Sequence, residues 1–136
     1  MYLVYQPEGT EEPKRWPYNP RKLMAAEREV IERRTDMVFA DFTQAVIKGS
    51  SLARRALLWV MLKREHPTMK FDDVDFAWDE LRLEYSRAEY DQMIANTGEN
   101  LSGEQREAAL RTLREERETA LEDPEHEGKA RPPVVD

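Results

Sequence analysis

The chain has 136 residues, 40% of them hydrophobic and 36% charged, and its formal net charge at pH 7 is −7. This length is usual for one domain, and apolar residues are scarce enough that a core must concentrate them. No run of about 18 apolar residues predicts a membrane span, and the order of a signal peptide is missing, so we expect no secretion. There is no cysteine and there are only two histidines, which excludes disulfides, thiolate chemistry and multi-histidine metal centres.

Charge is distributed unevenly along the chain. Residues 11–71 hold 13 basic and 8 acidic residues, whereas residues 72–127 hold 6 basic and 18 acidic residues, a net charge of −12. An acidic half repels phosphate, so nucleic acids and membrane surfaces are not expected partners. Such a half suits solubility or docking against a basic protein.

Residues 1–19 predict an extended arm that forms a β-hairpin. Residues 1–6 (MYLVYQ) are rich in strand formers, and residues 14–18 (KRWPY) can form the return strand. Pro17 lacks an N–H group, so this strand is expected at the edge of a sheet. Residues 81–85 alternate between apolar and polar and predict a third strand. Extended loops are the alternative for all three segments.

Two amphipathic helices open a helical core domain that we expect over residues 20–97. The first begins at Asn19-Pro20, because asparagine caps free N–H groups and proline at the first helical position loses no hydrogen bond, and it ends near Arg34. The second spans residues 38–48 and ends at Gly49, a residue suited to a left-handed C-cap.

The third helix, about residues 52–66, is apolar on nearly all sides in its middle. Such a helix is typical of the centre of a domain. Ser50-Ser51 caps its start and Pro67 ends it. The residues expected in the core, from these three helices, are Val30, Phe42, Val46, Leu57, Trp59 and Val60.

The acidic half predicts two more helices. Residues 86–89 (SRAE) match the capping-box pattern, which predicts a helix over residues 87–97 that Gly98 closes. A second capping box, Ser102 to Gln105, begins the main part of a C-terminal helix placed over residues 98–122. That helix is thinly apolar and should project from the domain.

Residues 123–136 are polar and contain proline, and they predict a disordered tail. The whole pattern predicts a mainly α, single-domain helical bundle. It carries a short N-terminal β-hairpin or small antiparallel sheet and a projecting C-terminal helix.

Groups able to carry chemistry are few. The densest carboxylate cluster comprises Asp72, Asp73, Asp75, Asp79 and Glu80. A divalent cation is one interpretation, but the spacing does not fit a calcium loop, and solvated charges and helix caps explain the same residues. His66 has no serine or carboxylate at a spacing that indicates catalysis. We therefore expect no enzyme, no cofactor and no metal site.

Five residues are candidates for binding a protein partner. Trp16 and Tyr18 lie where the surrounding core is thin, and Trp78 lies in the acidic stretch. These aromatic residues either pack on the domain's own helices or face a partner, because tryptophan and tyrosine are enriched at interfaces. Leu110 and Leu113 are apolar residues of the charged C-terminal helix and are the remaining candidates.

Four blocks of sequence together are similar to one protein family. They are VYQPEG (4–9), RWPYNPRKLM (15–24), AEREVIERRTDMVFADFTQAVIKGS (26–50) and ARRALLWVMLKREHPTMKFDDVDF (53–76). Their order resembles the small tail assembly chaperones of long-tailed phages that infect actinobacteria. The resemblance extends over about residues 4–85 and depends on the texture and order of the blocks, without a catalytic motif.

The resemblance implies a protein that is not an enzyme and uses no cofactor. Such chaperones bind the tape measure protein, keep it soluble and recruit tail tube subunits in the cytoplasm of the infected host, and are generally absent from the finished virion. The resemblance leaves open whether the chain associates with copies of itself. Many are also made in a longer, frameshifted form. Glu127-Gly128-Lys129 can be encoded by GAG GGA AAG, which contains the heptamer G GGA AAG, on which ribosomes can slip.

Two alternative functions stay open at this point. A structural head-to-tail or neck subunit would remain in purified particles, whereas a chaperone would leave. A nucleic-acid-binding regulator would bind DNA in a salt-sensitive way, and the net charge of −12 over residues 72–127 argues against it.

Overall fold

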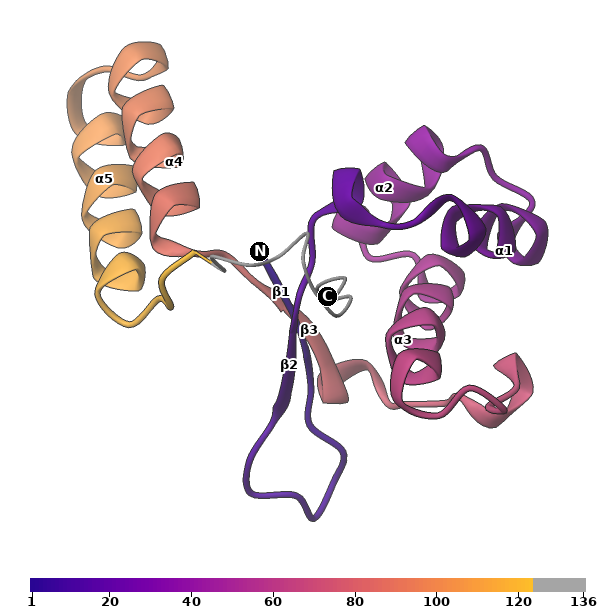
Figure 1. Ribbon diagram of the computed structural model, residues 1–136. Helices are drawn as coiled ribbons and strands as arrows, with labels where there is room; N and C mark the ends of the chain where they lie inside the picture. The colour runs from indigo at the N-terminus through magenta and orange to yellow at the C-terminus, as the bar shows by residue number, and fades with distance from the viewer. Residues whose placement is uncertain (124–136) are drawn as a thin grey trace, which may run out of the picture.

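The computed structural model describes residues 1–123; the tail expected at 123–136, except Asp123, and the Glu127–Lys129 segment lie outside the described residues. The described chain is mainly α-helical with one small antiparallel sheet, as the sequence predicts. The helices are α1 (Ala25–Thr35), α2 (Phe39–Lys48), α3 (Ser51–Glu65), α4 (Arg87–Asn100) and α5 (Gly103–Glu118). The strands are β1 (Tyr2–Tyr5), β2 (Lys14–Pro17) and β3 (Leu81–Glu84). Figure 1 shows α1, α2 and α3 on one side of the sheet and a hairpin of α4 and α5 on the other.

The sheet joins the N-terminal arm to the acidic half of the chain. Its order is β2-β1-β3, with both pairs antiparallel, so β1 is central and β2 lies at the edge as Pro17 predicts. Leu3 pairs with Trp16 on one side and with Leu83 on the other. All three side chains belong to the core that the sheet shares with α1, α2 and α3.

The start of the first helix differs from the prediction. Asn19 does act as a cap, accepting the Arg21 N–H at 3.0 Å, but it caps only a 3₁₀ turn, Pro20–Lys22. The backbone is extended at Leu23, and α1 begins at Ala25, where the Glu27 carboxylate accepts the Met24 N–H at 3.1 Å. Leu23 lies in the core, 5% exposed, and reaches it from this extended position and not from a helical one.

The middle of α3 is the centre of the bundle, as its composition predicts. Six consecutive residues, 56–61, are buried. Trp59 packs edge-on against Phe71, with ring centroids 5.5 Å apart, and its indole N–H donates to the Met69 carbonyl at 3.0 Å. Of the six residues expected in the core, Phe42, Val46, Leu57, Trp59 and Val60 are buried and Val30 is half-buried.

The two helices of the acidic half form a hairpin, so α5 does not project by itself. Gly98 does not close α4, which continues to Asn100, and the expected division between residues 97 and 98 falls inside that helix. Because α4 packs along α5, tertiary contact outweighs the helix-weakening effect of one glycine, about 1 kcal/mol. The Arg117 guanidinium also lies 2.5 Å from the Asp91 carboxylate across the hairpin.

The ends of α5 also differ from the prediction. Ser102 makes no capping hydrogen bond, because Gly103 has a φ of 64° and the chain does not enter the helix in the geometry of a capping box. The helix ends at Glu118, and the following residues return to the sheet. The Arg87 N–H donates to the Leu121 carbonyl at 2.9 Å, and the Tyr2 hydroxyl donates to the Glu122 carbonyl at 2.6 Å.

The Trp59→Ala variant should lose about 3–5 kcal/mol of unfolding free energy, because it removes a buried aromatic ring and leaves a cavity. Trp78→Ala is the matched control: Trp78 is 66% exposed, so its loss should cost less than about 1 kcal/mol. Urea unfolding followed by circular dichroism measures both. Equal losses for the two variants would show that Trp59 is not a central core residue.

Candidate functional site

Trp16 and Tyr18 are core residues, which corrects their place among the partner-binding candidates. Trp16 is 8% exposed and Tyr18 is 2% exposed. The alternation of β2 turns Trp16 to the same face as its partner Leu3. The Trp16 indole N–H donates to Glu65 at 3.2 Å, and Glu65 also pairs with Lys14. Both aromatic rings are therefore packed inside the protein and do not form an exposed surface for a partner.

Leu110 and Leu113 pack inside the hairpin of α4 and α5. Leu110 is 5% exposed and Leu113 is half-buried. The sequence shows a thinly apolar α5, and its apolar stripe is covered because α4 lies against it.

Within residues 1–123, no helix has the length and apolar content needed to cross a membrane.

Trp78 is the candidate that does face outward. It opens a 3₁₀ turn, Trp78–Glu80, and it is the most exposed of the large apolar side chains in the described residues. A hollow of about 470 Å³ beside it is lined by Leu52 and Phe76 and has Arg55 and Asp75 among its polar residues. We call this area, formed by Leu52, Arg55, Asp75, Phe76 and Trp78, the Trp78 surface.

The indole of Trp78 is held in place by α2 and α3. A β-carbon at Gly49 would lie 3.0 Å from the Trp78 ring, so the ring packs on a position that must be glycine; Gly49 also has a φ of 91°. The Arg54 guanidinium lies 5.5 Å from the ring centroid, and its Nε donates to the Val46 carbonyl at 2.9 Å. Burial lowers the pKa of Arg54 from its usual value.

Arg55 has an equally specific place, which explains why two arginines occur near the positive end of α3. Its Nε donates to the Val74 carbonyl at 2.6 Å, and a terminal nitrogen donates to the Phe71 carbonyl at 3.3 Å. Its guanidinium also lies 4.3 Å from the centroid of the Phe71 ring. These bonds fasten the segment after α3 to the start of that helix.

Three residues of the carboxylate cluster satisfy backbone N–H groups. Asp73 accepts the N–H of Lys70 at 3.1 Å, and Asp75 accepts the N–H of Phe76 at 2.9 Å. Glu80 accepts two N–H groups, from Ala77 at 2.7 Å and from Glu8 at 2.6 Å, and these bonds lower its pKa. In the part of the chain that the structure describes, no three His, Asp or Glu side chains are grouped so that they could hold a metal ion.

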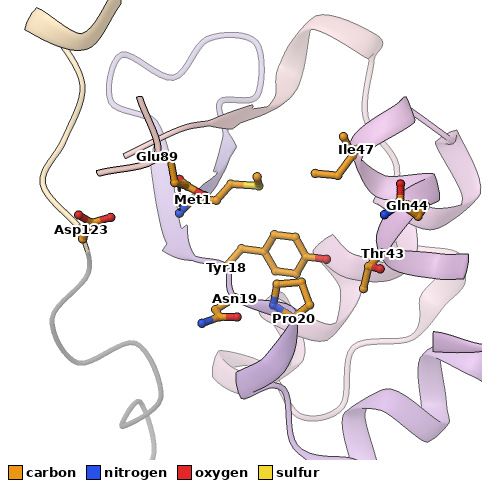
Figure 2. Close-up of a pocket in the computed structure, with 9 residues that line it drawn as sticks. All are labelled: Met1, Tyr18, Asn19, Pro20, Thr43, Gln44, Ile47, Glu89 and Asp123. Atoms are coloured by element: carbon orange, nitrogen blue, oxygen red, sulfur yellow. Dashed lines mark ion pairs between the residues drawn. The ribbon is translucent and has the colours of Figure 1, made fainter. Parts of the chain in front are cut away.

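A pocket of about 430 Å³ lies where the segment after β2, helix α2 and the start of α4 meet (Figure 2). The Tyr18 ring lines it, with its hydroxyl directed toward Thr43 and Ile47 of α2. That hydroxyl is buried and has no hydrogen-bond partner among residues 1–123, and burial raises its pKa. Thr43 donates its own hydroxyl to the Ala40 carbonyl at 2.8 Å, so its proton is directed to the backbone of α2.

Comparisons with known proteins identify no relative. The chain matches no protein-family model, no curated protein and no solved structure. The Trp78 surface combines an exposed aromatic ring with a rigid support, and this combination is suited to holding another protein.

The Tyr18→Phe variant should be more stable than the parent by about 1 kcal/mol at neutral pH, because it removes a buried hydroxyl without a partner. Urea unfolding at neutral pH measures the difference. A loss of stability in the variant would instead indicate that the hydroxyl is hydrogen-bonded.

The same variant changes the response to alkaline pH. The pKa of Tyr18 is raised in the folded state, so the folded protein keeps a proton that the unfolded chain releases above pH ~10. Stability is full below that pH and falls as the pH rises above it. Burial also raises the pKa of Tyr5 and Tyr90, so Tyr18→Phe should reduce the fall without abolishing it. An unchanged fall would contradict the burial of Tyr18.

Proposed function

We propose that this protein is a phage tail assembly chaperone. It binds the tape measure protein, keeps it soluble and helps to recruit tail tube subunits in the cytoplasm of the infected bacterium, and it leaves before the virion is complete. It acts without catalysis and without a cofactor. The resemblance of residues 4–85 to such chaperones supports the proposal, and the Trp78 surface is the structural observation that carries it.

The Trp78 surface suits a long helical partner that aggregates when alone. Trp78, Leu52 and Phe76 present apolar area, and Arg55 and Asp75 supply a polar rim. Tryptophan dominates the energetics of many interfaces, and the ring is already fixed by Gly49 and Arg54, so little conformational entropy is lost on binding.

The acidic half supplies the second requirement of a chaperone, solubility of the complex. Residues 72–127 have a net charge of −12, of which −5 belongs to residues 72–86, the segment that carries Trp78, and only −3 to the hairpin of α4 and α5. Figure 1 places this hairpin across the sheet from the bundle, so the acidic residues that accompany Trp78 are those of residues 72–86. An apolar partner covered at the Trp78 surface would thus acquire a strongly charged neighbour that opposes aggregation.

The Trp78→Ala variant tests the proposal in cells that also produce the tape measure protein. The parent chain should raise the soluble fraction of the tape measure protein, and Trp78→Ala should lose most of this effect, because the anchor of the apolar surface is gone. Quantitative immunoblotting of soluble and pelleted fractions measures the change.

Leu101→Ala is the control, because Leu101 is also exposed, at 39%, but lies in the turn between α4 and α5. It should act like the parent chain. If Trp78→Ala and the parent keep equal amounts of tape measure protein in solution, the Trp78 surface is not the binding site.

A further inference from the structure

A groove runs between α1 and α3, away from the residues of the Trp78 surface. Two adjoining hollows, of about 280 Å³ and 460 Å³, share Val30 and Lys63. From Ala26 to Arg34 they extend over about two turns of α1, or roughly 12 Å. We define the α1–α3 groove by Val30, Arg33, Arg34, Trp59, Val60 and Lys63.

The groove holds positive charge that the described chain does not neutralise. Within residues 1–123, no carboxylate forms an ion pair with Arg33, Arg34 or Lys63. Arg64 at the border differs, because Glu27 binds its guanidinium through two contacts of 2.8 and 3.0 Å. Three uncompensated cations in one groove of a protein with a net charge of −7 favour an anionic occupant.

The surroundings of Trp59 argue against nucleic acid as that occupant. The Lys63 ammonium lies 4.6 Å from the Trp59 ring centroid and the Arg34 guanidinium 5.7 Å from it. Arg34 also lies 4.6 Å from the Phe71 ring centroid. These cations cover the aromatic faces on which bases would stack. Half-buried Val30 and exposed Ala26 contribute aliphatic surface, which suits the apolar side chains of a protein.

We infer that the α1–α3 groove binds an acidic amphipathic helix of a partner protein. Its apolar residues pack on Val30 and Ala26, and its carboxylates pair with Arg33, Arg34 and Lys63. This is the helix-in-groove mode of recognition, with apolar anchors at helical spacing and complementary charges at the rim. The inference concerns a site other than the Trp78 surface and does not depend on the proposed chaperone function.

A synthetic acidic peptide is the probe. It has about 20 residues, enough for several helical turns, with leucines along one face and glutamates on the rest. Isothermal titration calorimetry with the full chain should detect binding that weakens as salt is raised. Two matched peptides, one with lysine in place of every glutamate and one with serine in place of every leucine, should bind much more weakly.

Two variants test whether the peptide binds at the α1–α3 groove. Arg33→Glu alters an exposed residue, and Arg33→Glu/Lys63→Glu reverses two of the three cations; the double variant should lose at least about tenfold in affinity. Arg111→Glu/Arg114→Glu, exposed on α5, changes the net charge equally and should bind like the parent chain. Circular dichroism checks that each variant is folded, and Arg33→Glu alone tests the groove if the double variant unfolds.

Four results would overturn the inference. They are equal affinity of the Arg33→Glu variant and the α5 control, equal binding of the glutamate and lysine peptides, and binding of single-stranded DNA that Arg33→Glu abolishes. The fourth is self-association, measured by light scattering, that Arg33→Glu abolishes, because the occupant would then be a second copy of this chain.

Discussion

The burial of α3 on nearly all sides is the constraint on which the rest of this structure depends. Residues 56–61 are buried in succession, so no single neighbouring element can cover them. Helices α1 and α2, one face of the sheet, and the segment around Phe71 and Val74 all contribute to the same core. Each fully buried leucine or methionine stabilises the fold by about 1.5–3 kcal/mol, which makes this contact the main source of stability in a small domain.

The same constraint places both candidate binding surfaces. Near the start of α3, Arg54 and Arg55 extend from the buried helix and fasten α2 and the segment at 71–78. That segment then carries Trp78 to the surface over Gly49. Near the end of α3, Lys63 and Trp59 meet Arg34 of α1 and form the groove. The helix is thus a rigid support whose two ends present different chemistry, one aromatic and one cationic.

Local patterns were sufficient to predict the features that depend on near neighbours. Gly49 is a left-handed cap, Ser86 and Glu89 form the capping box of α4, and the β-strands lie at the predicted segments. The sequence-based predictions are wrong where contacts between residues far apart in the sequence determine the local conformation. Gly98 stays helical because α5 packs on α4, and Leu23 leaves the helix and lies in the core.

The candidate site was predictable only in part, for the same reason. A tryptophan in an extended segment reads equally as core or interface, and only the pairing of β2 with β1 shows that Trp16 faces the bundle. The sequence did not indicate the α1–α3 groove, because Arg33 and Lys63 are 30 positions apart and each belongs to an ordinary basic pair. Packing of α1 on α3 combines them.

Hydrogen exchange of the full chain, alone and with the tape measure protein, tests the central claim most directly. The account predicts slower exchange of the amides at residues 49–55 and 75–80, which surround Trp78, and little change at the far end of the α4–α5 hairpin. Unchanged exchange around Trp78 in a sample where the two proteins form a complex would contradict the assignment of that surface to partner binding.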